Sequence, residues 1–391
     1  MQEAEEHFEV PIERIVPRGY GLAHAPGQTI FVALAAPGDR VKARVIQRKG
    51  AVSFAEITEI LEPGPDRIAA RCKYFGTCGG CDFQQLSYPE QLASKVSIIR
   101  DCFRRIAKIE THVEIGVIPS PLEFGYRSRA QWHLCPETRE IGYYQRNSRQ
   151  LVPIDECPKL VEPLNAELAR LRAGLDWESV PPGAAMIDSA VGDGGAVSTN
   201  LPQAERPQTI TFTAKGETFR YSADVFFQGN QYLIPALLDA ALAGSGGGTA
   251  LDLYSGVGLF SIPMSRTFEM VIAVEDNPES VRYARRNALE NERTNVDNRL
   301  KSVRHFLRDF SKADIDFVLL DPPRAGTERD TMENLIKLEV PRISYVACEP
   351  SVLARDLRRF IERGYAIDSV TAIDLFPQTH HVETVVRLSK R

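Results

Sequence analysis

The chain has 391 residues, more than one ordinary hydrophobic core accommodates, so we expect two or three domains. Its 43% apolar and 25% charged residues are usual for a globular protein, and we find neither an apolar run of membrane-spanning length nor a secretory leader. We therefore expect a cytoplasmic protein without a membrane segment. The formal net charge of -5 excludes a uniformly basic surface, although residues 14–49 contain Lys and Arg with a single acid, Asp39.

The first part of the chain predicts a small, basic β-barrel. Segments with strand composition follow one another between residues 7 and 60, and Gly- and Pro-containing turns such as PRGYGLAHAPGQ and APGD separate them. A barrel of this size with an excess of positive charge is typical of an OB-like RNA-binding module. We assign residues 1–62 to this domain.

A second region, 63–222, begins with Pro63-Gly64-Pro65 and continues with the cysteine-rich segment CKYFGTCGGCDFQQL. A helical pattern covers about 89–110, and the remainder is mixed and rich in strands. We expect a β-rich central domain that carries a metal site. The helix at 89–110 is a candidate to pack on the domain that follows.

In the third region, 223–391, strands alternate with amphipathic helices, as in MVIAVE followed by ESVRYARRNALE. This alternation predicts an α/β domain with a doubly wound, largely parallel, Rossmann-like sheet. Such sheets bind their ligands at the carboxyl ends of the strands. The residues that directly follow the strands are therefore the candidates for chemistry.

The first strand and turn of this domain carry the signs of a nucleoside-cofactor site. In LDLYSGVGLF a strand leads into Gly256 and Gly258, and the next strand ends in Glu275, 19 positions after Gly256. An acid at that distance is placed to hold a ribose diol. Ser261 stands where a dinucleotide fold has a third glycine. This favours a nucleoside cofactor without a pyrophosphate, of which S-adenosylmethionine is the commonest.

Asp321 ends the strand in IDFVLLDPPRAG, and the two prolines after it stiffen the loop. Asp-Pro-Pro also occurs in amino-group methyltransferases that act on adenine, where an aromatic residue usually follows to stack on the base. Arg324 occupies that place here. An adenine N6 methyltransferase is therefore an alternative that the arginine disfavours.

Cys348 and Glu383 supply the groups that methylation at carbon 5 of a uracil requires. That carbon becomes nucleophilic only after a thiolate has added to carbon 6, and a base must remove the carbon 5 proton afterwards. Cys348 follows the apolar strand in YVACEP, and Glu383 follows a loop with His380 and His381. Because Asp321 and Cys348 end consecutive strands of one predicted sheet, we expect both at its ligand-binding edge.

With these residues the sequence resembles the 5-methyluridine RNA methyltransferases of ribosomal and transfer RNA. The matching segments run in order through the C-terminal half: FFQGN (226–230), LDLYSGVGLF (251–260), Glu275, DPPRAG (321–326), YVACEPSVLARDL (345–357) and HVETV (381–385). The resemblance implies an S-adenosylmethionine-dependent enzyme that extrudes a uridine from folded RNA and methylates its carbon 5. The basic barrel resembles the TRAM module of this family.

The resemblance also implies roles for individual residues. Cys348 attacks carbon 6, and Glu383 removes the proton from carbon 5. The residues that hold S-adenosylmethionine, some of them also close to the target base, are Gln228, Tyr254, Glu275 and Asp321. Glu349 stands where Asn often follows the nucleophile, a departure that bears on the rate and not on the class of reaction.

Cys72, Cys78 and Cys81 form a chelating pattern that needs a fourth thiolate, and Cys157 is the candidate. Four thiolates suit zinc equally well. The resemblance decides for a [4Fe-4S] cluster, because the cluster-bearing members of the family show C-x5-C-G-G-C and a distant fourth Cys. Radical enzymes that cleave S-adenosylmethionine typically use C-x3-C-x2-C with three ligands, so we interpret the cluster as structural or RNA-orienting.

Two hypotheses from different functional classes result. The first is an enzyme that methylates carbon 5 of a uridine in RNA. The barrel together with the four cysteines favours 23S rRNA as its substrate, and uridine 54 of tRNA is the alternative. The second hypothesis is a non-catalytic RNA-binding iron-sulfur protein. We expect a monomer.

Overall fold

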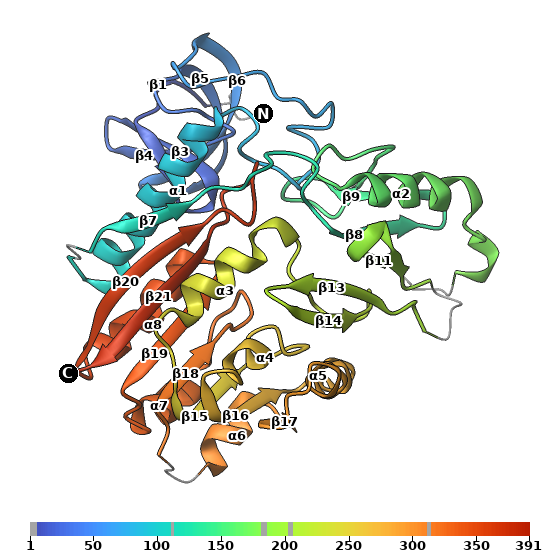
Figure 1. Ribbon diagram of the computed structural model, residues 1–391. Helices are drawn as coiled ribbons and strands as arrows, with labels where there is room; N and C mark the ends of the chain where they lie inside the picture. The colour runs from blue at the N-terminus through green and yellow to red at the C-terminus, as the bar shows by residue number, and fades with distance from the viewer. Residues whose placement is uncertain (1–5, 111–112, 181–185, 202–205, 311–313) are drawn as a thin grey trace.

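The computed structural model describes residues 6–110, 113–180, 186–201, 206–310 and 314–391. Figure 1 shows three lobes: an N-terminal β-domain, a central β-domain beside it, and a large α/β domain that contains the C-terminus. Among the described residues, no helix combines the length and apolar character needed to cross a membrane. The first five residues of the predicted range 1–62 lie outside the described part of the chain.

The N-terminal β-domain is a sheet of six strands in the order β1-β5-β6-β4-β3-β2. The strands are β1 (His7–Pro11), β2 (Arg14–Val16), β3 (Tyr20–Ala25), β4 (Gln28–Ala33), β5 (Arg40–Lys49) and β6 (Val52–Glu62). Register shifts between β5 and β6 bend these long strands around apolar side chains such as Ile30 and Val41. The buried Asp39 accepts hydrogen bonds from the Gly64 amide (2.9 Å) and the Arg67 guanidinium (2.7 Å). It thereby fastens the sheet to the next segment.

The central β-domain is an antiparallel sheet covered by one helix. Its strand order is β10-β9-β8-β11-β12, from β8 (Arg129–Cys135), β9 (Glu140–Tyr144), β10 (Leu151–Pro153), β11 (Met186–Val191) and β12 (Val197–Thr199). Helix α2 (Glu162–Gly174) places Leu164, Leu168 and Leu171 on one face. These leucines form an apolar cluster with Trp132 and Ile187 of the sheet.

The α/β domain is built on an eight-stranded sheet in the order β17-β16-β15-β18-β19-β21-β20-β7. Its C-terminal strands are β15 (Gly247–Leu253), β16 (Phe268–Glu275), β17 (Val296–Leu300), β18 (Phe317–Leu320), β19 (Arg342–Ala347), β20 (Tyr365–Ile373) and β21 (Glu383–Lys390). Strands β15 to β19 are parallel, and β21 runs antiparallel to β19 and β20. The strand order reverses between β15 and β18, where such sheets bind ligands.

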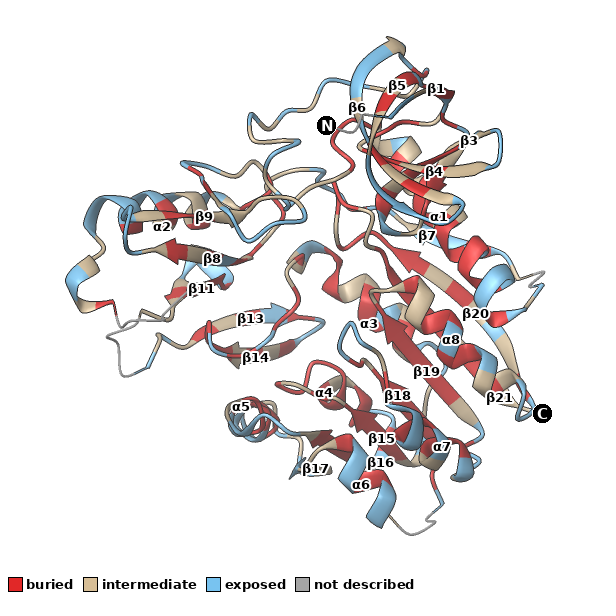
Figure 2. Ribbon diagram, turned by 180° about the vertical axis from the view of Figure 1, so that it is seen from behind, coloured by how far each residue is buried: buried red, intermediate tan, exposed pale blue. Residues whose placement is uncertain are grey.

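Two apolar layers enclose this sheet. Along β18, Val318 and Leu320 belong to one apolar cluster, and Phe317 and Leu319 to the other. The first layer contains α6 (Val303–Asp309), α7 (Arg329–Lys337) and α8 (Pro350–Ile361), and the second contains α3 (Ile234–Leu242), α4 (Ser261–Met264) and α5 (Pro278–Glu290). Figure 2 shows the inner strands as mostly buried, with exposed residues along the outer helix faces.

Three segments of the predicted central region, 63–222, pack with the α/β domain, and the helix expected at 89–110 is one of them. Helix α1 (Tyr88–Cys102) shares the apolar cluster of α8, and β7 (Ile115–Ile118) pairs with β20 at the edge of the α/β sheet (Figure 1). The hairpin of β13 (Ile210–Ala214) and β14 (Glu217–Tyr221) shares the apolar cluster of α3. These segments therefore belong to the α/β domain. A strand can join a sheet edge from a distant part of the chain, which residue periodicity does not reveal.

Candidate active site

Two neighbouring antiparallel strands bring Cys348 and Glu383 together. Cys348 directly follows β19, and Glu383 is the first residue of β21. Ala347 pairs with Thr384, so the next position of this register sets Cys348 opposite Glu383. Pro350 begins α8 and turns the chain away from the sheet, which leaves the cysteine at the strand end.

Burial dominates the electrostatics of this pair. Burial and the Glu383 carboxyl raise the pKa of Cys348 to about 12, and the Arg324 guanidinium counteracts them. Burial and the nearby Asp321 raise the pKa of Glu383 well above its usual value. Oε1 of Glu383 is buried and has no hydrogen-bond partner within the described residues. In the protein without substrate the Cys348 thiol therefore holds its proton at neutral pH, and burial shifts Glu383 toward its protonated form.

Arg324 is a site residue that the sequence did not assign. The sequence analysis noted only that Arg324 stands where adenine methyltransferases have an aromatic residue that stacks on the base. In the structure its guanidinium interacts with the Cys348 sulfur and lies near His381. The signal for it is its position three residues after Asp321, on the loop that leaves the carboxyl end of β18.

The residues predicted to bind the cofactor lie near the point where the strand order reverses, between β15 and β18. They are Tyr254, Gly256 and Glu275. Tyr254 and Gly256 have left-handed backbone conformations, with φ of 65° and 55°, so the chain turns sharply after β15. The Gly256 amide donates a hydrogen bond to Oε2 of Glu275 (2.9 Å). The amides of Asp276 and Asn277 donate to Oε1 (3.0 and 2.9 Å). These amides fix the carboxylate at the end of β16, where a ribose diol is held in such folds.

A buried acid next to this turn, Asp252, was not predicted from the sequence. It accepts a hydrogen bond from the Ser261 hydroxyl. Ser261, which replaces the third glycine of a dinucleotide fold, therefore holds the Asp252 carboxyl in place. Burial raises the pKa of both Asp252 and Asp321 to about 7, and Asp252 adds to the shift of Asp321. Both acids lie at the carboxyl ends of strands on either side of the switch point, the edge at which such sheets bind ligands.

Gln228 is buried in a segment that the central β-domain holds. The carbonyl of Gly229 accepts a hydrogen bond from the Ser128 amide (2.8 Å), and Arg129 donates to the Ala223 carbonyl (3.0 Å). Ser128 and Arg129 therefore position the segment that carries Gln228. The sequence feature that could have identified them is the segment YRSRAQ, in which two arginines flank Ser128 directly before a buried strand.

The loop that leads to Glu383 is fastened to helix α1. Lys95 of α1 is buried and donates a hydrogen bond to Asp374 at the start of this loop (2.5 Å). Gln91, also on α1, accepts a hydrogen bond from the Gln378 amide (2.9 Å). Helix α1 is therefore a positioning element for Glu383.

The four cysteines predicted as ligands line one cavity of about 320 Å³: Cys72, Cys78, Cys81 and Cys157. Burial raises the pKa of Cys78 to about 11, and the sulfurs of Cys81 and Cys157 add to the shift. No three of the four sulfurs lie within 4.8 Å of one another. A Cβ atom on Gly79 would lie 3.1 Å from the Tyr144 carbonyl oxygen, so this glycine lets the cysteine loop approach β9 closely.

The cysteine cavity adjoins the loop of Glu383. Arg324 and His381 line the same cavity as the cysteines. Asp82, which follows Cys81, accepts hydrogen bonds from the His380 amide (2.7 Å) and from the His380 ring. The cysteine segment and the loop before β21 therefore support each other directly.

A second cleft, of about 660 Å³, is lined by all three lobes. Arg18 of the N-terminal β-domain, Arg146 of the central β-domain and Arg324 of the α/β domain line it, together with Glu349. Glu349 directly follows Cys348 in the chain, so this cleft extends to the residue next to the cysteine. Three arginines around one cleft suit a phosphate backbone.

The strand order and the paired acids at the switch point define a Rossmann-like methyltransferase domain, and comparisons with known proteins agree. A family model described as tRNA (Uracil-5-)-methyltransferase matches residues 200–391. The structure of Pyrococcus abyssi tRNA (uracil-54, C5)-methyltransferase, in complex with S-adenosyl-L-homocysteine, is 25% identical with a TM-score of 0.74. The likeness covers 97% of this chain and 100% of that one.

Two relatives extend the likeness over nearly the whole sequence. A protein of Aquifex aeolicus described as an uncharacterized RNA methyltransferase is 31% identical, over 97% of this chain and 98% of its own. The Pseudomonas putida 23S rRNA (uracil(1939)-C(5))-methyltransferase is 30% identical, over 96% of this chain and 92% of its own. The chain belongs to the RNA (uracil-5-)-methyltransferase family and is an S-adenosylmethionine-dependent enzyme. The predicted family resemblance is confirmed.

Proposed function

We propose that this enzyme methylates a uridine of 23S rRNA, with Cys348 as the covalent nucleophile and Glu383 as the base. The opposition of these two residues across β19 and β21 carries the proposal. A thiol and a carboxyl on adjacent strands can reach carbons 6 and 5 of the same pyrimidine ring. The relatives that act on 23S rRNA support this substrate over tRNA.

The proposed reaction begins when the Cys348 thiolate adds to carbon 6 of the uridine and converts the ring to an enolate. Carbon 5 then attacks the methyl group of S-adenosylmethionine, and S-adenosylhomocysteine leaves. Glu383 takes the proton from carbon 5, the double bond returns, and the thiolate is eliminated. Arg324 assists because its positive charge favours the ionised forms of Cys348 and Glu383.

For the cofactor, we propose that Glu275 holds the ribose of S-adenosylmethionine. Tyr254 and Gly256 shape the turn beside it, and Asp321 and Gln228 stand near the sulfonium and the target base. The fixed Glu275 carboxylate and the sharp turn after β15 support this assignment.

We propose that the N-terminal β-domain, a TRAM-like module, binds RNA together with the other two lobes. The cleft with Arg18, Arg146 and Arg324 supports this, because it leads from the N-terminal sheet to the neighbour of Cys348. One chain supplies every wall of that cleft, which supports a monomer as the working unit. A cytoplasmic location accords with an RNA substrate.

The residues Cys72, Cys78, Cys81 and Cys157 fit a [4Fe-4S] cluster, which we propose as their ligand. A single tetrahedral zinc would bring thiolates to about 3.8 Å from one another at Zn–S bonds of ~2.3 Å. No three of the four sulfurs lie that close together, and the C-x5-C-G-G-C pattern with Cys157 on the same cavity supports the cluster. Because Asp82 connects this segment to His380, the cluster would stabilise the loop before Glu383 and take no part in methyl transfer.

The test is incubation of anaerobically purified enzyme with methyl-labelled S-adenosylmethionine and unmodified total RNA, followed by nucleoside analysis and mapping. We expect label in 5-methyluridine of 23S rRNA with the wild type and none with Cys348→Ala, which should still bind the cofactor. Cofactor binding by the variant shows that it is folded. Full activity of Cys348→Ala would contradict the mechanism.

The second candidate substrate is uridine 54 of tRNA, favoured by the likeness to the Pyrococcus abyssi enzyme. The mapped position of the label separates the two substrates. Absence of label from any RNA would favour the remaining alternative, a non-catalytic RNA-binding iron-sulfur protein.

A further inference from the structure

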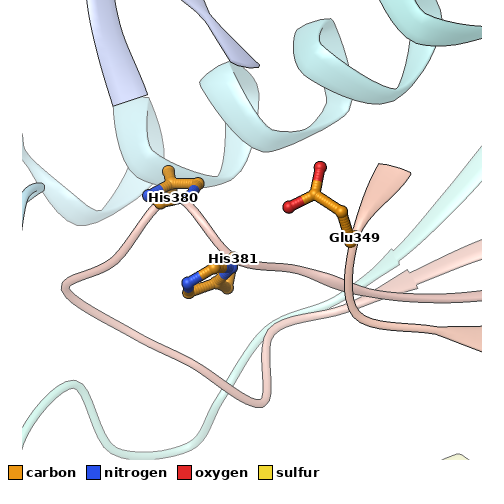
Figure 3. Close-up of side chains that lie close together, drawn as sticks. All are labelled: Glu349, His380 and His381. Atoms are coloured by element: carbon orange, nitrogen blue, oxygen red, sulfur yellow. The ribbon is translucent and has the colours of Figure 1, made fainter. Parts of the chain in front are cut away.

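Three ligand-type side chains meet beside the methyl-transfer residues. Glu349, His380 and His381 each offer one ligand atom, and these atoms all lie within 4.8 Å of one another (Figure 3). They come from distant segments, the start of α8 and the loop before β21 (Figure 3). All three line the cleft of about 660 Å³. Two imidazoles and one carboxylate are a ligand set that zinc, iron and nickel accept.

Each of the three side chains is held in place. Nδ1 of His380 shares a hydrogen bond with the Asp82 carboxylate, which leaves Nε2 available. A carboxylate behind the imidazole is the usual support of a metal-binding histidine. Oε1 of Glu349 accepts a hydrogen bond from the Ser351 hydroxyl (2.7 Å), which leaves its second oxygen. Nδ1 of His381 is buried and has no hydrogen-bond partner in the described part of the chain.

Charges of both signs surround the three side chains. On the walls of the same cleft the carboxylates of Glu349 and Asp82 face the positive charges of Arg18, Arg146 and Arg324.

We propose that Glu349, His380 and His381 bind one divalent transition-metal cation next to Cys348. Three protein ligands leave further coordination positions open. Because the site lines the cleft, a phosphate oxygen of the RNA can take one of them, so the cation would help to anchor the substrate beside the nucleophile. The RNA contact rests on the proposed function, whereas cation binding does not. The site is distinct from the four cysteines, which offer only thiolates.

The test uses Ni²⁺ as the probe, because imidazole ligands bind it well. The untagged full chain is purified anaerobically, its iron content is recorded, and Ni²⁺ binding is measured by isothermal titration calorimetry. We expect one Ni²⁺ per chain and an affinity at least about tenfold weaker in Glu349→Gln and in His380→Ala. Glu349→Gln keeps an oxygen for Ser351, so it preserves the start of α8.

The matched control is His305→Ala, which removes an exposed imidazole on α6 and should leave the affinity unchanged. If His380→Ala does not fold, Glu349→Gln decides. Absence of Ni²⁺ binding by the wild type, or unchanged affinity in Glu349→Gln, overturns the proposal. If Ni²⁺ binds as expected but does not increase RNA affinity, the cation site stands and its contact with RNA is refuted, irrespective of the methylation assay.

Discussion

Cys348 stands opposite Glu383, one position beyond the last paired residues of β19 and β21. This relationship follows from β21 being antiparallel to β19, because the end of one strand then meets the beginning of the other. Backbone pairing thereby fixes the proposed nucleophile and the proposed base, and their separation does not depend on a flexible loop. In the proposed mechanism, the sheet itself therefore places the thiol and the carboxyl against one pyrimidine ring.

The first prediction concerns the covalent intermediate. In Glu383→Gln the methylated adduct forms but cannot lose its carbon 5 proton, so protein and RNA remain joined. We expect turnover to fall by about 100- to 10,000-fold, the usual contribution of a general base. We also expect a labelled protein–RNA band on a denaturing gel. Cys348→Ala should give no such band. A Glu383→Gln variant with normal turnover would assign the base to another residue.

The second prediction concerns pH and Arg324. Burial raises the pKa of Cys348 to about 12 and also raises that of Glu383, and the reaction needs both groups ionised, so kcat/KM should keep rising with pH from neutrality toward alkaline pH. Arg324 lowers the pKa of both groups. Arg324→Ala should therefore shift the profile to higher pH and lose at least about tenfold in rate near neutrality. Arg324→Lys keeps the charge and should retain most of the profile. An unshifted profile in Arg324→Ala would exclude this electrostatic role.

The third prediction concerns the cofactor edge. Glu275→Gln retains the shape of the side chain but removes the charge that strengthens a hydrogen bond to a ribose hydroxyl. Such bonds contribute about 1.5–3 kcal/mol, so the Kd for S-adenosylmethionine should rise by about 10- to 100-fold. Calorimetric titration measures it. Glu269→Gln, an exposed position on the same strand, is the control and should bind normally. Equal affinities in the two variants would remove Glu275 from the site.

The residues at the strand ends could be foreseen from the sequence. Asp321 and Cys348 each follow an apolar segment of strand length, and carboxyl ends of adjacent parallel strands share an edge. Glu275 was foreseen because it ends the next strand, at a suitable spacing from Gly256. The structure sets these residues along one edge of the sheet.

The supports of the site could not be foreseen, because they join segments far apart in the chain. Lys95 and Asp374 are 279 positions apart, and Asp82 and His380 are 298 apart. Local composition contains no sign of such pairings, since Lys95 lies in an ordinary helical pattern that allows it to be exposed. The sequence made the helix at 89–110 a candidate to pack on the α/β domain, but the pairing of β7 with β20 leaves no sign in local composition.

The fourth prediction tests one of these supports, the pair of Lys95 and Asp374. Both side chains are almost fully buried, so Lys95→Met leaves a carboxylate without its partner in a dry environment. We expect a loss of about 3–5 kcal/mol in the free energy of unfolding measured by urea titration. The double variant Lys95→Met/Asp374→Leu removes both charges and should regain most of that stability. Lys337→Met, on the exposed face of α7, should change the free energy by less than about 0.5 kcal/mol. If the double variant is as unstable as the single one, Lys95 stabilises the protein through packing and not by pairing its charge with the Asp374 carboxylate.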